Sequence, residues 1–179
     1  TVTVTDNNNC SVTSSVNAGR TDATSAVVDS THNISCNGLS DGAIYITPSG
    51  GDGNYTYQWS FGGVTTQDLE NVPAGAYTVT VSDGAGCTFT ISNDSVTENP
   101  VLSAFASASN TGCGASTGTA TVTASGGTGT GTYTYLWSFN NLTQPTITGL
   151  SSGTYTVTIH DANLCSYTTT VNVGTTSGP

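Results

Sequence analysis

The sequence predicts an all-β protein, and three observations lead to this fold class. The polar residues are mainly Thr, Ser, Gly and Asn, and they are threaded with Val, Ile, Tyr and Trp, a composition typical of strands joined by tight turns. No apolar pattern with a helical period is sustained along the 179 residues. A long internal repeat, finally, divides the chain into units of the size of small β-sandwiches.

The repeat is anchored on tryptophan and cysteine. Trp59 and Trp137 lie 78 residues apart, and Cys87 and Cys165 show the same spacing. Around these anchors, SGGDGNYTYQWSF returns as SGGTGTGTYTYLWSF, and LENVPAGAYTVTV returns as ITGLSSGTYTVTI. We therefore expect an orphan strand pair, a linker, two domains and a tail, at 1–19, 20–24, 25–100, 101–175 and 176–179 respectively.

Each domain is expected to contain six or seven short strands, with a tryptophan on the third, which is typical of an immunoglobulin-like sandwich. Successive strand residues face opposite sides of a sheet, so alternating aromatic and β-branched residues define the inward faces. The expected strands are Ala26–Ser30, Ala43–Thr47, Tyr55–Phe61, Val64–Leu69, Tyr77–Ser82 and Thr88–Ser92, and, in the second domain, Leu102–Ala106, Thr119–Thr123, Tyr133–Phe139, Thr143–Ile147, Tyr155–His160 and Ser166–Val173.

Aromatic residues take two structural roles in this prediction. Tyr55, Tyr57 and Trp59 share one face of a strand, and we expect that face to form the core rather than a platform for sugar stacking. Tyr77 and Tyr155 each follow a glycine turn, where a tyrosine hydroxyl can bond back to the chain that enters the turn, as in a tyrosine corner. Tyr45 and Phe61 are the candidates for exposed aromatic contacts.

The phrase TVTVTDNNNC at the start of the chain resembles the closing phrases TVTVSDGAGC and TVTIHDANLC of the two domains. The first 19 residues therefore correspond to the last strand pair of a repeat, and such a pair cannot bury a face alone. Two interpretations stay open: a segment of a longer tandem array, or strands that pair with a neighbouring molecule. The expected intersubunit residues are Thr1, Val2, Thr3, Val4, Thr5, Val12 and Val16.

Five cysteines are present, an odd number that the repeat explains. Each domain has one cysteine between its first two strands and one between its last two, and we expect these two connections to lie at the same end. The expected disulfides are therefore Cys36–Cys87 and Cys113–Cys165, which place the protein in an oxidising compartment. Cys10 is left over, either unpaired or intermolecular. Free thiols are the alternative, and the absence of a CxxC pair argues against a metal site.

Charge and composition exclude several partners. The formal net charge is −10 and Arg20 is the sole Lys or Arg, so the chain lacks the basic clusters that bind nucleic acid or anionic membranes. No apolar run is long enough to span a membrane, and direct membrane insertion is not expected. Pro100, in the short link TENPV, stiffens the joint between the two domains, which suits a semi-rigid rod.

No catalytic constellation is apparent, and we expect no enzyme and no cofactor. His32 and His160 occupy unrelated positions in the two repeats, so neither can complete a repeated triad. Calcium is the one weak metal candidate, with Asp41 and Asp83 expected at the same end of the first domain. The alternative for Asp83, shared with Asp6 and Asp161 four residues before a cysteine, is an Asx-turn.

The Thr-rich surface is also a candidate for glycosylation. Several Asn residues stand two positions before Ser or Thr, a spacing that is frequent by chance in so Thr-rich a chain. Two further sites have the form Asp-Ser-Thr or Asp-Ser-Val, and their serines are candidates for O-glycosylation. The candidate residues are Ser30, Ser95, Asn33, Asn54, Asn93 and Asn141.

The pieces SCNGLSDGAIYI, SGGDGNYTYQWS and AGAYTVTVSDGAGC, in this order, resemble the SprB-type repeat. The second copy departs from it, with CGASTG in place of CNGLSDG. The resemblance implies an immunoglobulin-like module of giant surface adhesins of gliding bacteria and of related secreted proteins. The expected function is a non-enzymatic subunit or segment of an extracellular fibre at the bacterial cell surface, with copies of itself as partner. The alternative is an adhesin module that binds a glycan or surface ligand through its loops.

Overall fold

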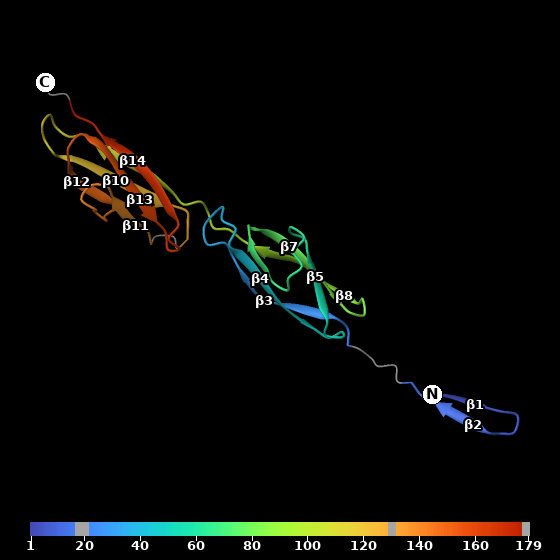
Figure 1. Ribbon diagram of the computed structural model, residues 1–179. Helices are drawn as coiled ribbons and strands as arrows, with labels where there is room; N and C mark the ends of the chain where they lie inside the picture. Colours follow the sequence, from blue (N-terminus) through green and yellow to red (C-terminus); the bar gives the residue numbers. More distant parts are fainter. Residues whose placement is uncertain (17–21, 129–131, 177–179) are drawn as a thin grey trace.

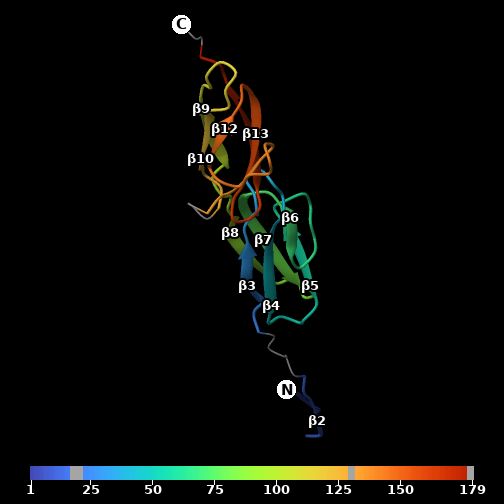
Figure 2. The ribbon, with the colours of Figure 1, turned by 90° about the vertical axis from the view of Figure 1, so that its left-hand side faces the viewer.

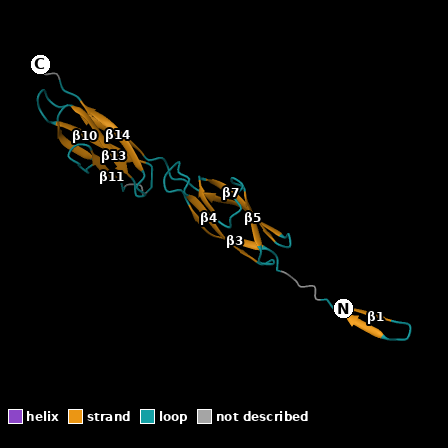
Figure 3. Cartoon of the chain, in the orientation of Figure 1, coloured by secondary structure: helices purple, strands orange, loops and turns teal. Residues whose placement is uncertain are grey.

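The computed structural model describes residues 1–16, 22–128 and 132–176, and its regular structure there consists of strands alone (Figures 1 and 3). The all-β prediction is confirmed. The expected boundaries at 19 and 20 and most of the tail 176–179 lie outside the described residues. No helix in the described part of the chain is long and apolar enough to cross a membrane.

The chain begins with a hairpin of two strands, β1 (Val2–Thr5) and β2 (Ser11–Ser14), which pair antiparallel with Val4 opposite Val12. The hairpin is drawn apart from the rest of the protein in Figure 1. Its valines form one face, and Val2, Val4 and Val12 are all more than 60% exposed. Within the described residues, this apolar face is uncovered.

The first sandwich contains two sheets with the strand orders β3-β4-β6 and β5-β7-β8. Apolar residues alternate along the strands and fill the space between the sheets, among them Ile44, Trp59, Leu69 and Val79. The strands are β3 (Ser25–His32), β4 (Gly42–Ser49), β5 (Tyr55–Trp59), β6 (Leu69–Val72), β7 (Gly75–Asp83) and β8 (Thr88–Val96).

The second sandwich repeats this arrangement, with the strand orders β9-β10-β12 and β11-β13-β14. Its own core surrounds Trp137, Leu150 and Val157, which are fully buried. The strands are β9 (Ser103–Ser109), β10 (Gly118–Ser125), β11 (Thr134–Trp137), β12 (Thr146–Leu150), β13 (Gly153–His160) and β14 (Ser166–Val173). Both units are immunoglobulin-like sandwiches, as the sequence predicts.

The fourth strand of each sandwich begins later than the sequence predicts. β6 spans Leu69–Val72 where Val64–Leu69 was expected, and β12 spans Thr146–Leu150 where Thr143–Ile147 was expected. The residues before each strand bind the tryptophan instead: Trp59 Nε1 donates to the Thr66 carbonyl at 3.0 Å. This segment carries the chain from one sheet to the other, so strand pairing starts only after it.

The predicted tyrosine corners are present in both sandwiches. The Tyr77 hydroxyl donates to the carbonyl of Pro73 at 2.6 Å, and the Tyr155 hydroxyl donates to that of Ser151 at 2.9 Å. Each bond joins the start of β7 or β13 to the chain that enters the turn. A main-chain carbonyl that would otherwise lack a strand partner is thereby satisfied.

Each sandwich has two poles that position the site described below. The proximal pole holds the start of the first strand and the hairpin between the last two strands; in the first sandwich, Thr24 donates there to Asp83 at 2.8 Å. The distal pole holds the loop after the first strand and the end of the last strand; there, Ile34 N donates to the Thr97 carbonyl at 3.2 Å. The distal pole of the first sandwich faces the proximal pole of the second (Figures 1 and 2).

Candidate functional site

A disulfide joins the two sandwiches. Cys36, in the loop at the distal pole of the first sandwich, is bonded to Cys165, in the β13–β14 hairpin at the proximal pole of the second. The two Cα atoms are 5.6 Å apart and the residues are 129 positions apart in sequence. The bridge therefore closes the joint between domains, a role that no sequence signal pointed to.

The expected pairs Cys36–Cys87 and Cys113–Cys165 are wrong. β8 ends beside Ile34 at the distal pole, so its first residue, and with it Cys87, lies at the proximal pole. The two cysteines of one sandwich are thus at opposite poles and cannot meet. Cys87 and Cys113 are free and exposed, and so is Cys10.

Polar and apolar contacts surround the bridge. Asn163 Nδ2 donates to the Ser35 carbonyl across the joint at 3.1 Å, and Asn37 Nδ2 donates to the carbonyl of Asn99 in the link at 2.8 Å. Beside the bridge lies an open groove of about 450 Å³, lined by Leu39, Val101, Leu102, Leu164 and Tyr167 among others. The joint thus combines a short link, a disulfide and two amide hydrogen bonds.

The hairpin that carries Cys165 is held by an aspartate, and the same device occurs three times. Asp161 Oδ1 accepts the N–H groups of Asn163 and Cys165 at 3.0 and 2.9 Å. In the other two hairpins the acceptors are Asp83, for Ala85 and Cys87, and Asp6, for Asn8 and Cys10, at 2.8 to 3.0 Å. These are Asx-turns that fix the position of each cysteine.

Hydrogen bonding tunes the acidity of the two aspartates that lie in sandwiches. The Thr24 hydroxyl, followed by the Cys87 N–H, holds the pKa of Asp83 below its ordinary value. Burial alone would raise the pKa of Asp161, but donors headed by the Thr128 N–H outweigh it and lower the pKa. Both carboxylates are therefore ionised acceptors at neutral pH.

The weak calcium candidates do not form a site. Asp41 accepts a hydrogen bond from the Ser35 N–H at 3.0 Å at the distal pole, whereas Asp83 lies at the proximal pole. The expectation that they share one end is wrong, because the strands between them span the length of the sandwich. Among the residues that the structure describes, no group of three or more His, Cys, Asp or Glu side chains could hold a metal ion.

The two candidate contact aromatics are engaged within the first sandwich. The Tyr45 hydroxyl donates to Glu70 at 3.2 Å, and its ring packs edge-on against His32. The bond to Glu70 raises the pKa of Tyr45. Phe61 packs edge-on against Tyr77, with ring centroids 5.8 Å apart.

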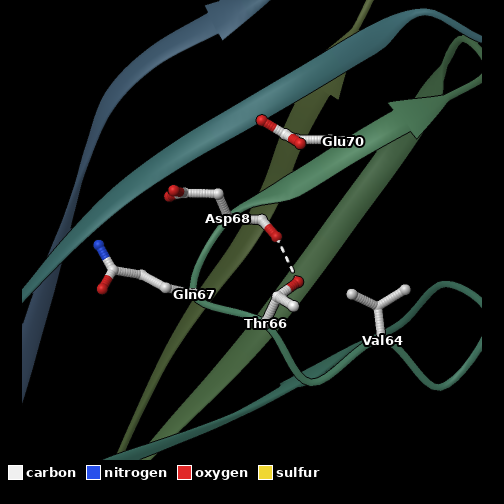
Figure 4. Close-up of a pocket in the computed structure, with 5 residues that line it drawn as sticks. All are labelled: Val64, Thr66, Gln67, Asp68 and Glu70. Carbon is white, nitrogen blue, oxygen red and sulfur yellow. Dashed lines mark hydrogen bonds between the residues drawn. The ribbon is translucent and has the colours of Figure 1, made fainter.

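A shallow pocket of about 300 Å³ lies beside β6, lined by Val64, Thr66, Gln67, Asp68 and Glu70 (Figure 4). Its polar side chains have structural partners. Asp68 accepts the N–H of Ile46 at 3.0 Å, and Gln67 donates to the carbonyl of the same residue at 2.6 Å. These two side chains continue the edge of β4 beyond the end of its pairing with β6.

The candidate glycosylation residues lie on the surface of the two sandwiches. The Asn33 amide is already used, because its oxygen accepts the Thr97 N–H at 2.9 Å. Asn93 and Asn141 have positive φ angles of 61° and 52°, which places them at a strand irregularity and in a turn. All six side chains are exposed: Ser30, Asn33, Asn54, Asn93, Ser95 and Asn141.

Comparison with solved structures finds distant likenesses. The chain matches a C-terminal 282-residue fragment of intimin, solved with the intimin-binding domain of its translocated receptor, at 16% identity and a TM-score of 0.41, with 87% of this chain covered. It matches an I-band fragment of titin at 14% identity and 0.41, with 88% covered, and an amphioxus IgVJ-C2 molecule at 12% identity and 0.30, with 87% covered.

The chain spans 64% of the intimin fragment, 66% of the titin fragment and 98% of the amphioxus molecule. No curated protein matches the sequence. The SprB repeat family matches residues 28–64 and 106–142, which run from β3 to just past β5 and from β9 to just past β11. The two matched segments occupy the same positions in the two sandwiches, so each sandwich contains a segment similar to the SprB repeat.

Proposed function

We propose that this chain is a stiff spacer segment of a secreted bacterial surface fibre or adhesin stalk. The observation that carries the proposal is the disulfide between Cys36 and Cys165, which binds two SprB repeats end to end. SprB repeats and immunoglobulin-like folds are typically structural or adhesive modules rather than enzymes, and a spacer needs no catalysis. A disulfide suits an extracellular location.

Stiffness follows from two covalent connections at one joint. The link around Pro100, although short and stiffened by the proline, attaches the second sandwich at one point only. The bridge adds a second point of attachment, and the Asn163–Ser35 hydrogen bond supports it. The disulfide prevents the second sandwich from rotating about the link, and the link prevents it from rotating about the disulfide. The two sandwiches therefore keep one relative orientation.

The bridge also changes how the chain carries force. When the chain is pulled from its two ends, the covalent path runs from Thr1 to Cys36, crosses the disulfide to Cys165 and continues to the C-terminus. The intervening segment, including most of both sandwiches, carries no tension along its backbone. A fibre segment built in this way resists extension even if a sandwich unfolds.

Single-molecule stretching tests this proposal. Reduction, or the variant Cys165→Ser, is expected to release the 129-residue segment and add about 430–460 Å of contour length, at roughly 3.3–3.6 Å per residue. The variant Cys10→Ser is the matched control, because Cys10 is free, and it should stretch like the wild type. If oxidised wild-type protein extends as far as Cys165→Ser, the two sandwiches are not locked and the spacer proposal fails.

The alternative, ligand binding through loops, calls for exposed aromatic residues gathered at one end. The exposed aromatic residues are dispersed instead: Phe61 and Phe89 lie on the first sandwich, and Phe105 and Tyr167 on the second. We therefore favour the spacer.

For the hairpin of residues 1–16, we propose pairing with strands of another repeat, in the same polypeptide or in a neighbouring molecule. Its exposed valine face supports this pairing, and mapping the partner of Cys10 distinguishes the two sources.

A further inference from the structure

The two remaining cysteines of the sandwiches occupy the same repeat positions as the bonded pair. Cys113 occupies the position in the second repeat that Cys36 occupies in the first, and Cys87 occupies the position of Cys165. Cys36 and Cys165 are bonded to each other, whereas Cys87 and Cys113 are free and exposed. Cys113 lies at the distal pole of one sandwich and Cys87 at the proximal pole of the other, at opposite ends of the sandwich pair.

Cys113 sits on a structured loop. Thr111, 1% exposed, donates its N–H to the Gly174 carbonyl at 2.9 Å, as Ile34 does to Thr97 beside Cys36. The Thr111 hydroxyl donates to the Ala115 carbonyl at 2.9 Å and accepts the Thr117 N–H at 3.0 Å. The loop is thus held at the distal pole in the same way as the loop of Cys36.

Cys87 is held equally firmly at the proximal pole. Its N–H donates to Asp83 Oδ1 at 2.8 Å, and the second oxygen of Asp83 accepts the Thr24 hydroxyl at 2.8 Å. Cys165 has the same support from Asp161, whose second oxygen accepts the Thr128 N–H at 2.8 Å. Both exposed cysteines are therefore presented by the same local structures that present the bonded pair.

We propose that Cys113 of one copy of this chain forms a disulfide with Cys87 of a second copy, so that the internal joint is repeated between molecules. Each thiol loses its proton, and the two electrons pass to a disulfide oxidant such as glutathione disulfide, which leaves as two thiols. The proposal extends the proposed spacer from one pair of sandwiches to a head-to-tail fibre, and it rests on the same joint.

The second joint differs from the first in its hydrogen bonds. Ala85 stands where Asn163 stands in the internal joint, and Gly114 stands where Asn37 stands, so both amide donors are missing. The disulfide is then the main connection, and assembly is expected to require oxidation. Cys10 is not the expected partner. Its hairpin lies apart from both sandwiches (Figure 1), so it offers no sandwich pole against which the neighbouring copy could stack.

Oxidation of the whole chain in a Cys10→Ser background tests the joint. With glutathione disulfide, we expect a ladder of oligomers on a non-reducing gel, and peptide mapping should find Cys113 linked to Cys87. Adding Cys87→Ser or Cys113→Ser should leave monomers. A mixture of these two variants should stop at dimers, since each retains one half of the joint.

Two results would overturn the proposal. One is a protein that stays monomeric under oxidation while Cys36–Cys165 forms. The other is indiscriminate cross-linking, in which the Cys87→Ser variant alone gives dimers through Cys113–Cys113. Because the stretching experiment is made on single chains, a failed joint leaves its result unchanged, and the failure of the fibre joint is distinguishable from the failure of the spacer.

Discussion

At the scale of single residues, the aspartate of the closing hairpin connects local turn structure to the joint. Asp83 and Asp161 each use one oxygen for the Asx-turn and the other for a bond to a neighbouring loop. The first bond is dictated by the sequence spacing from Asp to Cys. The second exists only in the folded sandwich, and it fixes the hairpin, and thus the cysteine, at the proximal pole.

These aspartates predict acid sensitivity. Their pKa values are lowered in the folded state, so their contribution to the free energy of unfolding is complete above the ordinary aspartate pKa, about 3.9, and is lost as the pH falls through the folded values. Urea unfolding between pH 7 and pH 2 should therefore show a loss of stability below about pH 4.

The variants Asp83→Asn and Asp161→Asn should weaken this acid dependence in the first and second sandwich respectively. Glu98→Gln is the matched control, because Glu98 is exposed and follows the end of β8, outside the closing hairpins. It should lose stability with falling pH as the wild type does. If the free energy of unfolding falls with pH in the same way for the wild type and all three variants, the two carboxylates do not cause the acid sensitivity.

At the scale of elements, the hairpin of residues 1–16 contrasts with its two counterparts. Its Asx-turn bonds match theirs, and Thr3 and Thr13 share a hydroxyl hydrogen bond across the strands at 2.9 Å, as Thr158 and Thr168 do at 3.2 Å. The difference is burial. Val4 is 62% exposed, whereas Val157 in β13 is fully buried against the facing sheet. Turn chemistry defines the hairpin, and a second sheet is needed to cover it.

A peptide of residues 1–16 is therefore expected to be largely unstructured in water by circular dichroism, because two strands without a facing sheet are marginal at best. Deleting the same residues from the whole chain should leave the unfolding of both sandwiches unchanged. A well-folded isolated peptide would show that the hairpin is stable without a facing sheet, and a sandwich destabilised by the deletion would show that the hairpin has a stabilising partner within one chain.

At the scale of the whole molecule, the bridge couples two sandwiches that have separate cores. Cys36 lies at the joint, close to the link around Pro100, and so does Cys165. If one sandwich unfolds while the other stays native, the unfolded segment is still tied at both ends to the native one. The disulfide therefore restricts the unfolded state of each sandwich in turn.

Removal of the bridge should consequently destabilise both sandwiches. On the chain-entropy relation, closing a segment of about 65 residues raises the free energy of unfolding by roughly 4 kcal/mol. This is the largest loss of stability that we expect for each sandwich in Cys36→Ser or Cys165→Ser. Calorimetry of the two variants should show a lower midpoint temperature for both unfolding transitions, whereas Cys87→Ser and Cys113→Ser should leave both midpoint temperatures unchanged. A variant at Cys36 that lowers only the first transition would indicate bridges within sandwiches instead.

The sequence by itself determined the β class, the repeat, the core tryptophans, the tyrosine corners and the Asx-turns, because each depends on side-chain alternation or on spacings of a few residues. It placed the fourth strand too early, since nothing local shows that residues such as Thr66 bind the indole of Trp59. The partner of Cys36 was decided by the tertiary structure alone. Which pole each loop occupies depends on the path of all six strands, and which poles meet depends on how the two sandwiches stack.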